Sequence, residues 1–336
     1  MEIVNIMKRV VLAVLVSAII LAGCAPATGP ASPQALTKIR LPMGYIANVQ
    51  YAPFYIAVDK GYFKAEGIDI EFDYRFETDG MKLVGAGELP FAVVSGEQVP
   101  LARAQGLPVV YVMQWWQKFA VGIASLADKN IKSVNDLIGK SVGLPGFFGA
   151  SYIGWRGLLY KAGINESDIK TQDIGFTQVA ALQQGKVDAA VIYVNNEPVQ
   201  LRAAGLDVNV IAVSDSLELV ANGLITNEQT IKDKPELVRG MVRALLHGLN
   251  DAIADPELAF NTSKKFVEGL GSDPAKDEIQ KQVLAESIKL WQGDAPGRSS
   301  AAAWDTTQDV LLSMGLIKAK IDPAQLFTNR FVDEAK

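Results

Sequence analysis

The sequence is poor in cysteine and histidine, and these two absences exclude several kinds of site. Cys24 is the only cysteine among 336 residues, so the chain cannot form an internal disulfide. His247 is the only histidine, so a zinc site made of cysteine and histidine side chains is excluded. We therefore expect no metal site, and the folded chain must owe its stability to a hydrophobic core.

Basic clusters and complete nucleotide-binding loops are missing as well. The formal net charge is -5 and no run of basic residues stands out, which argues against nucleic acid as a partner. The glycine-rich segment 143–149 lacks the lysine and the serine or threonine that complete a phosphate-binding loop. His247 lies in an amphipathic stretch, 235–254, where a structural position on a helix is expected instead of acid–base catalysis.

One long apolar run is present, and it lies near the amino terminus. It covers residues 10–22, follows two basic residues, and is shorter than the roughly 20 apolar residues of a membrane-spanning helix. A charged start and a small-residue end are typical of a secretory signal. The sequence Leu-Ala-Gly-Cys that ends at Cys24 resembles the lipobox of bacterial lipoproteins, which implies lipidation of this cysteine. We predict a lipoprotein signal peptide at residues 1–23; a plain secreted protein and a start at Met7 stay open.

After this segment the sequence changes to proline, alanine, glycine and serine. Residues 24–37 have the composition of a flexible tether, and the globular part is expected to begin near Lys38. A lipidated tether of this kind predicts a protein anchored at the extracytoplasmic face of the cell membrane.

Short apolar strands alternate with helical segments in the first two thirds of the chain, which is typical of α/β proteins with parallel sheets. The predicted strands are 39–41, 68–74, 91–94, 109–113, 121–124, 141–144, 187–193 and 208–213. The predicted helices between them are 52–60, 99–105, 151–162 and 177–184, each ended by a glycine.

From residue 232 onward the strands disappear and helices follow one another. The apolar pattern predicts helices at 235–254, 256–270, 276–291 and 301–314. Such an extension has to pack on a domain that is already formed. We therefore predict two lobes, each a mostly parallel sheet flanked by helices, with the helical extension on the first lobe. The first lobe would comprise 38–118 and 220–336 and the second 119–219, with a hinge and a ligand cleft between them.

Four segments resemble a known protein family. They are 51–67 (YAPFYIAVDKGYFKAEG), 102–109 (ARAQGLPV), 139–146 (GKSVGLPG) and 185–198 (GKVDAAVIYVNNEP). Together they resemble the pyrimidine-precursor and sulfonate-binding family of type II periplasmic binding proteins, over essentially the whole mature chain. The resemblance implies a type II periplasmic-binding-protein fold. It also implies a monomeric, extracytoplasmic component of an ABC importer that serves a permease and its ATPase subunit.

Within this family the resemblance is strongest to riboflavin-binding lipoproteins, which implies riboflavin as the transported ligand. A formylated aminopyrimidine, a precursor of thiamine, is the alternative, and an aliphatic sulfonate is a weaker one. A ligand-sensing adaptor without a role in transport also stays open, because sequence discriminates poorly between a sensor and a transport component.

The same family includes an enzyme, the eukaryotic thiamine-pyrimidine synthase. That enzyme needs a lysine that carries pyridoxal phosphate, a histidine that is consumed as substrate, and a cysteine-rich loop. The lysine and histidine positions correspond here to Val94 and Gln98, and Cys24 is the only cysteine. We therefore expect a binding protein that catalyses no reaction and holds no cofactor.

Candidate ligand-binding residues follow the predicted strands, because ligands of open α/β sheets lie beyond the carboxyl ends of the strands. A planar heteroaromatic ligand needs rings for stacking and polar groups for its edge. The aromatic candidates are Tyr45, Tyr51, Trp115, Phe148 and Tyr193. The polar candidates are Asn48, Gln50, Ser95, Glu97, Asn195 and Glu197.

Structural roles compete with binding at several of these positions. Core packing explains a buried Tyr51 equally well. Neighbours in an extended segment point opposite ways, so we prefer Trp115 to Trp116 for the cleft. Helix capping is the alternative for the asparagines at 195–196. The glycine-rich turn at 143–149 either presents backbone N–H groups to the cleft or is purely structural.

The charges near the predicted cleft favour one class of ligand. A sulfonate or nitrate calls for arginine or lysine, whereas the charged residues near the expected binding loops are acidic: Glu77, Asp79, Glu97 and Glu197. The family resemblance implies that Glu197 pairs with the ring edge of a pyrimidine-like ligand. Riboflavin meets these conditions, because it is a neutral ring compound with a uracil-like edge and a hydroxylated chain.

Overall fold

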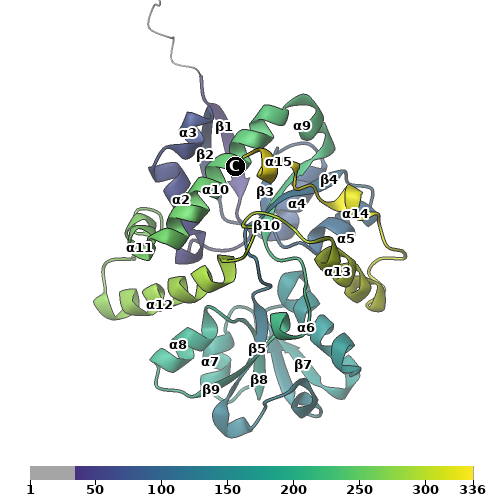
Figure 1. The fold of residues 1–336 in the computed structure, drawn as a ribbon. Coiled ribbons are helices and arrows are strands. Elements are labelled where there is room, and N and C mark those ends of the chain that lie inside the picture. The colour runs from purple at the N-terminus through teal and green to yellow at the C-terminus, as the bar shows by residue number, and fades with distance from the viewer. Residues whose placement is uncertain (1–34, 336) are drawn as a thin grey trace, which may run out of the picture. The chain divides into compact units, whose positions relative to one another are not determined.

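The computed structural model describes residues 35–335, and Leu36–Lys336 form one compact unit (Figure 1). The predicted signal peptide, the predicted lipidation of Cys24 and nearly all of the predicted tether lie outside the described residues. In the described part of the chain, no helix has the length and apolar character that crossing a membrane requires.

The first lobe, in the upper part of Figure 1, contains two small sheets. Strand β1 (Thr37–Pro42) pairs in parallel with β2 (Ile68–Asp73). Strand β10 (Gly223–Asn227) lies between β3 (Ala92–Val94) and β4 (Val109–Gln114) and is antiparallel to both. The helices that accompany these strands are η1 (Val49–Tyr51), α2 (Ala52–Asp59), α3 (Tyr62–Ala65), α4 (Glu77–Gly85) and α5 (Gln98–Ala104).

The second lobe, in the lower part of Figure 1, is built on one five-stranded sheet. Its strand order is β7 (Lys170–Asp173), β6 (Ser141–Leu144), β8 (Ala189–Tyr193), β5 (Val121–Leu126) and β9 (Val208–Ala212). Strand β6 is parallel to β7 and β8, whereas β5 is antiparallel to β8 and β9. The helices of this lobe are α6 (Gly149–Ala162), α7 (Gln178–Gln183) and α8 (Glu197–Ala203), with short 3₁₀ turns η2 (Ala127–Lys129), η3 (Val134–Leu137), η4 (Glu166–Asp168) and η5 (Val213–Asp215).

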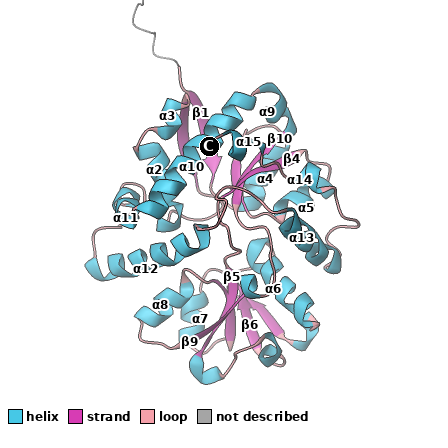
Figure 2. Ribbon diagram, in the orientation of Figure 1, coloured by secondary structure: helices cyan, strands magenta, loops and turns pink. Residues whose placement is uncertain are grey.

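The rest of the described chain is helical and returns to the first lobe (Figure 2). Its helices are α9 (Glu228–Asp233), α10 (Pro235–Ala254), α11 (Pro256–Ser263), α12 (Pro274–Trp291), α13 (Ala301–Ser313), α14 (Pro323–Leu326) and α15 (Arg330–Glu334). Helix α10 packs against α2, whereas α12 contacts α8 and α13 contacts α6 in the second lobe. The helical extension therefore packs on the first lobe, as predicted, and also contacts the second.

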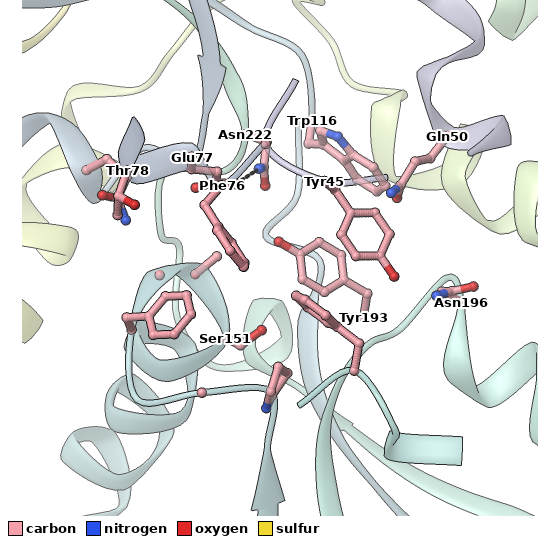
Figure 3. A pocket seen from close by; sticks show the side chains of 18 of the residues that line it. Tyr45, Gln50, Phe76, Glu77, Thr78, Trp116, Ser151, Tyr193, Asn196 and Asn222 are labelled. Atoms are coloured by element: carbon pink, nitrogen blue, oxygen red, sulfur yellow. Dashed lines mark hydrogen bonds between the residues drawn. The ribbon is translucent and has the colours of Figure 1, made fainter. Parts of the chain in front are cut away.

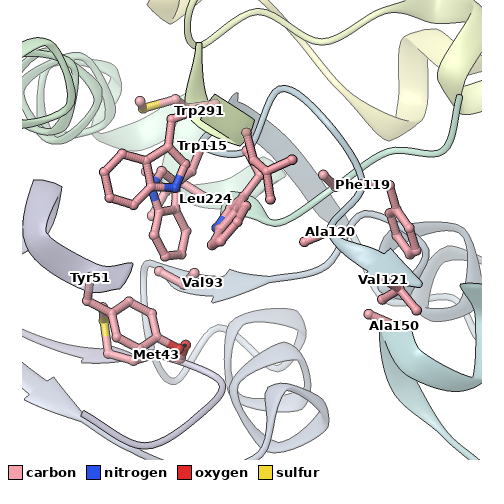
Figure 4. Packing of buried hydrophobic residues seen from close by; sticks show 14 of the residues in the cluster. Met43, Tyr51, Val93, Trp115, Phe119, Ala120, Val121, Ala150, Leu224 and Trp291 are labelled. Carbon is pink, nitrogen blue, oxygen red and sulfur yellow. Dashed lines mark hydrogen bonds between the residues drawn. The ribbon is translucent and has the colours of Figure 1, made fainter. Parts of the chain in front are cut away.

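Large aromatic side chains fill the core where the two lobes meet (Figure 4). Trp115 and Trp116 have at most 2% of their surface exposed, and Trp291 at the end of α12 is fully buried. The ring centroids of Trp115 and Trp116 lie 6.2 Å and 6.0 Å from that of Trp291. Each ring of this size removes roughly 150–250 Å² from water, so this cluster fixes the segment that links the lobes.

Three of the four helices predicted for the carboxyl-terminal third agree closely with their predicted bounds. The predicted helix 235–254 is α10, and the helix predicted at 301–314 is α13, which ends one residue earlier. The helix predicted at 256–270 ends at Ser263 because the following residues form turns, including Gly269 with φ 77°.

Two strands were absent from the sequence-based prediction. Strand β7 has the sequence Lys-Thr-Gln-Asp and lies at the edge of its sheet, so it lacks an apolar signal. Strand β10 was predicted as a connection between the lobes. Because β5 and β10 each follow a crossing between the lobes, they enter their sheets from the opposite end and run against their neighbours. The other strands of each sheet share one direction, so the sheets are mostly parallel, as predicted. The strand pairing does not delimit the hinge, so the residue bounds of the lobes stay a prediction.

The close contact between α10 and α2 requires a residue without a side chain at Gly248, and this requirement can be tested. A Cβ atom at this position would lie 2.1 Å from the carbonyl oxygen of Pro53, which is backbone and cannot turn away. We expect Gly248→Ala to lower the free energy of unfolding by about 1–3 kcal/mol, measured by urea unfolding. Gly157→Ala in α6 is the matched control, because its Cβ would meet only side-chain methyl groups, those of Leu217, Leu219 and Val310 at 3.2 Å, 3.5 Å and 3.7 Å. Equal destabilisation by both changes would contradict this prediction.

Candidate functional site

A pocket lies between the two lobes and is lined by side chains from both (Figure 3). Its space amounts to about 970 Å³, including the part that is open to solvent. The first lobe and the crossing segments contribute Gly44, Tyr45, Gln50, Tyr51, Phe76, Glu77, Thr78, Gln98, Trp115, Trp116 and Asn222. The second lobe contributes Pro145, Gly146, Phe148, Gly149, Ala150, Ser151, Phe176, Gln178, Tyr193, Asn196 and Glu197.

The predicted ligand-binding residues divide into two groups in this structure. Those on the pocket wall are Tyr45, Gln50, Tyr51, Trp115, Phe148, Tyr193 and Glu197. Those away from the wall are Asn48, Ser95, Glu97 and Asn195. Each member of the second group has a hydrogen-bond partner, described below, that sequence alone did not show.

The back of the pocket is a packed aromatic wall. Tyr51 and Trp115 are stacked with ring centroids 5.3 Å apart and planes inclined by 29°. Phe54 meets the Trp115 ring edge-on at 5.1 Å. The Tyr51 hydroxyl donates to the carbonyl oxygen of Met43 at 2.8 Å. Tyr51 and Trp115 are therefore core residues that also border the pocket, so the two interpretations of Tyr51 are compatible.

Trp116 borders the pocket together with Trp115, although alternation predicted that the two would face opposite ways. The backbone N–H groups of both residues donate to the carbonyl oxygen of Asn222, each at 3.0 Å. The chain bends at this point, so the alternation of an extended strand does not apply. The indole N–H of Trp115 has no hydrogen-bond partner among the described residues.

Asn48 and Asn195 are held by contacts outside the pocket. Asn48 caps η1, because its Oδ1 accepts from the backbone N–H of Gln50 at 3.1 Å. Asn195 is fully buried and its Nδ2 donates to Ser287 Oγ of α12 at 2.9 Å, which joins α12 to the second lobe. Asn196 precedes α8, yet its side chain forms no capping bond to the helix. Helix capping therefore does not account for this pair of asparagines.

Glu197 is the best-defined polar group of the second lobe. Its Oε2 accepts from the backbone N–H of Tyr193 at 2.9 Å, and its Oε1 accepts from Asn196 Nδ2 at 3.3 Å. Burial raises the pKa of Glu197 to about 7. Burial, with a smaller effect from Glu197, raises the pKa of the nearby Tyr45 hydroxyl to about 12. This carboxyl group is poised to accept a proton or a hydrogen bond from a ligand.

Glu77 supplies a second carboxyl group from the first lobe, at the start of α4. Its Oε2 accepts from the backbone N–H of Ser95 at 3.0 Å, and its Oε1 accepts from Asn222 Nδ2 at 2.9 Å (Figure 3). Burial raises the pKa of Glu77. None of the residues that line the pocket is a lysine, arginine or histidine.

The glycine-rich turn before α6 forms another side of the pocket. Gly146, Gly149 and Ser151 all border it, and α6 begins at Gly149 without a side-chain cap. The unpaired backbone N–H groups of a helix start favour an oxygen atom of a ligand. In the described part of the chain, no group of three or more acidic, cysteine or histidine residues is arranged to hold a metal ion.

Two aromatic pairs join the lobes at the rim of the pocket. Tyr45 of the first lobe meets Phe176 of the second edge-on, with ring centroids 5.4 Å apart. Phe76 of the first lobe meets Phe148 of the second edge-on at 6.0 Å. Phe76, Phe148 and Phe176 each expose more than half of their surface. Sequence reasoning missed Phe76 and Phe176, because each is a single aromatic residue in a polar loop.

Comparison with known proteins identifies the family. A family model described as NMT1/THI5 like matches residues 48–259, which is more than half of the chain. The chain belongs to this family. The predicted relationship to pyrimidine-precursor and sulfonate-binding proteins is thereby confirmed.

Individual relatives and solved structures agree with this assignment. The riboflavin-binding protein RibY of Chloroflexus aurantiacus is 42% identical over 92% of this chain and 90% of that protein. The formylaminopyrimidine-binding protein of Halalkalibacterium halodurans is 28% identical over 88% of this chain and 90% of that protein. The crystal structure of the periplasmic aliphatic sulphonate binding protein SsuA from Escherichia coli matches with a TM-score of 0.70. It is 18% identical and covers 90% of this chain and 100% of that chain, which confirms the two-lobed periplasmic-binding-protein fold.

The raised pKa of Glu197 predicts a pH-dependent stability of the ligand-free NMT1/THI5-like protein. A carboxyl group with a pKa of about 7 when folded and 4.5 when unfolded binds more protons in the folded state between these values. The free energy of unfolding therefore falls as the pH rises through this range, by on the order of 3 kcal/mol from this group. We expect Glu197→Gln to reduce the fall, measured by urea unfolding at about pH 5 and pH 8.

Glu88→Gln is the control for this measurement, because Glu88 is exposed on the surface and the substitution removes the same charge. Its pH dependence should equal that of the unmodified protein. An unchanged pH dependence in Glu197→Gln would show that Glu197 is ionised in the folded protein.

Proposed function

We propose that this protein binds riboflavin between its lobes, outside the cytoplasmic membrane, and delivers it to the permease of an ABC importer. The observation that carries the proposal is the pocket lining, which combines aromatic rings with two carboxyl groups and contains no basic side chain. The 42% identity to the riboflavin-binding protein of Chloroflexus aurantiacus supports the choice of ligand.

The aromatic lining suits a flat heteroaromatic ring. Tyr45 and Tyr193 face the pocket from different lobes, with Trp116 beside them (Figure 3). A ring stacked on such side chains gains about 1–3 kcal/mol per contact, by analogy with bases on aromatic residues. The isoalloxazine of riboflavin is a ring system of this kind.

The polar lining suits the edge and the hydroxylated chain of riboflavin. The uracil-like edge has one N–H donor between carbonyl acceptors, which matches the Glu197 carboxylate beside the amide of Asn196. Gln178 has 5% of its surface exposed and borders the pocket, so its amide is available to a ligand. Glu77 and Gln50 in the first lobe are then free to form hydrogen bonds with the hydroxyl groups of the riboflavin side chain.

The charge of the pocket argues against an anionic ligand. A sulfonate would approach Glu77 and Glu197 without a lysine or arginine to neutralise it. The sulphonate-binding protein of Escherichia coli therefore shares the fold of this chain, and we do not extend its ligand class to this pocket.

A formylated aminopyrimidine is the second candidate, supported by the 28% identity to the formylaminopyrimidine-binding protein. Its single ring would pair with Glu197 through its edge. It lacks the hydroxylated chain that would use the carboxyl group of Glu77 on the opposite lobe. Riboflavin uses both lobes, and we prefer it for this reason.

Transport requires that the lobes close over the ligand and open again. We propose that the hinge lies at the crossings near residues 119 and 219. The lobes would capture the ligand when the two aromatic pairs at the rim of the pocket come together. A monomer tethered through Cys24 would present the closed form to a permease and its ATPase. Val94 and Gln98 at the positions of the synthase's lysine and histidine support a binding protein over an enzyme.

Riboflavin binding is tested by fluorescence titration of the chain from residue 25 onward. We expect saturable quenching of the flavin at one equivalent, because a ring stacked on tyrosine or tryptophan loses fluorescence. Glu197→Gln should weaken binding about tenfold, the loss of one hydrogen bond to a charged group. Glu88→Gln should leave the affinity unchanged. Unquenched flavin, with quenching of protein fluorescence by a formylaminopyrimidine, would replace riboflavin by the second candidate.

The rim pairs predict a kinetic effect. Phe148→Ala removes the edge-to-face contact with Phe76 and should raise the dissociation rate of riboflavin about two- to tenfold, from a contact worth roughly 0.5–1.5 kcal/mol. Phe147→Ala is the matched control, because Phe147 packs on Tyr152 within the second lobe at 5.7 Å. Stopped-flow fluorescence measures both rates, and equal rates in the two variants would exclude closure through this pair.

A further inference from the structure

Ser95 lies between two glutamate side chains behind the wall of the pocket. Its Oγ is 2.5 Å from Oε2 of Glu77 and 2.5 Å from Oε1 of Glu97. Glu77 borders the pocket, whereas Glu97 has no exposed surface and lies behind it. No lysine, arginine or histidine acts on the pKa of either carboxyl group.

These two short contacts are best satisfied when the group Glu77–Ser95–Glu97 holds one carboxyl proton. A serine hydroxyl carries one hydrogen and can donate it to one carboxylate only. The second contact at 2.5 Å then requires a proton on the other carboxyl group, which donates to Ser95 Oγ. The two glutamates therefore hold one proton between them.

The surrounding hydrogen bonds place this proton on Glu97. Glu77 also accepts from the backbone N–H of Ser95 and from Asn222 Nδ2, and these donors stabilise its ionised form. Glu97 accepts from Gln98 Nε2 at 3.1 Å, and its Oε2 has no partner among the described residues. Burial, with the negative charge of Glu77 as a second cause, raises the pKa of Glu97 to about 7.

We propose that Glu97 is a positioning residue for ligand binding: protonated Glu97 donates to Ser95 Oγ, so the Ser95 hydroxyl donates to the ionised Glu77 and holds it in place as a hydrogen-bond acceptor for the ligand. Affinity then weakens as the pH rises above neutrality. The proposal rests on the proposed function, in which Glu77 binds the hydroxylated chain of riboflavin.

Loss of the proton disturbs the pocket through Glu77. Two ionised carboxylates would then face one hydroxyl at 2.5 Å, and only one of them would receive its hydrogen. Glu97 is enclosed, so Glu77 at the pocket wall is the group with room to move. Its bond to Asn222 would be lost, and the Asn222 carbonyl oxygen holds the backbone of Trp115 and Trp116.

Other titratable groups near these carboxyl groups are few. Tyr51, Tyr111 and Tyr193 lie close enough to be affected by Glu77 or Glu97, and burial raises the pKa of each well above its usual value. These three hydroxyl groups therefore stay neutral over the whole pH range in which the glutamates titrate. Glu197 titrates in the same range as Glu97 because burial raises its pKa to about 7, so its contribution has to be measured separately.

The test is the riboflavin dissociation constant between about pH 5.5 and pH 8.5, measured by flavin fluorescence. We expect the constant of the unmodified protein to rise above neutrality by at most about tenfold per pH unit, the limit for one linked proton. Glu97→Gln should keep the affinity seen at low pH and lose this rise, because its amide donates to Ser95 Oγ permanently. Glu88→Gln should keep the pH dependence of the unmodified protein. Glu197→Gln measures how much of the pH dependence comes from Glu197. An unchanged profile in Glu97→Gln would overturn the proposal.

The proton itself is observable without ligand by infrared spectroscopy. The difference spectrum between the unmodified protein and Glu97→Gln should show the C=O band of a carboxylic acid at about pH 6, and the band should fade by about pH 8.5. Ser95→Ala should lower the riboflavin affinity at low pH and flatten the profile, which gives a second variant if Glu97→Gln does not fold. Absence of riboflavin binding at every pH would overturn the proposed function, whereas absence of the band would overturn the position of the proton.

Discussion

The whole site depends on how the two chain crossings between the lobes are held together. The carbonyl oxygen of Asn222, on the second crossing, accepts the backbone N–H groups of Trp115 and Trp116, on the first. This pair of bonds bends the first crossing, so both indoles contribute to one wall of the pocket. The Asn222 side chain then donates to Glu77, so the same residue also orients a carboxyl group of the site. The aromatic wall and the carboxylate are therefore positioned by one backbone arrangement.

The second governing constraint is the burial of carboxyl groups without basic partners. Glu97 and Glu197 have at most 7% of their surface exposed, and the groups that shift their pKa values include no cation. Desolvation disfavours the charged form, so these carboxyl groups keep their protons up to near neutral pH. Backbone and amide N–H groups donate hydrogen bonds to them and stabilise the ionised form that remains. Such a pocket stays rich in hydrogen-bond acceptors while its negative charge stays small. This is the chemistry that a neutral ligand with N–H and O–H donors requires.

The sequence predicted part of the site for clear reasons. Tyr193 and Glu197 could be found because Tyr193 ends a strongly apolar strand and Glu197 follows it, and the carboxyl ends of strands point to the cleft of an open sheet. Ser95 and Glu97 also follow a strand, yet their side chains form the layer behind the wall, with Glu77 in front of them. Asn195 lies two residues after β8, and its side chain donates to Ser287 of α12, a residue distant in sequence. Strand ends indicate the correct region, whereas the direction of each side chain depends on packing from other segments.

The sequence by itself determined the α/β class, the helical carboxyl-terminal extension and the family, because apolar periodicity and local motifs are properties of neighbouring residues. It also determined that the chain has no internal disulfide and no cysteine–histidine metal site. Only the tertiary structure decided that Trp116 joins Trp115, that Phe76 meets Phe148, and that Glu77 and Glu97 share Ser95. Each of these contacts joins segments that are separated along the chain or bends a segment out of its regular conformation. Such contacts arise when the lobes pack, and no local pattern in the sequence records them.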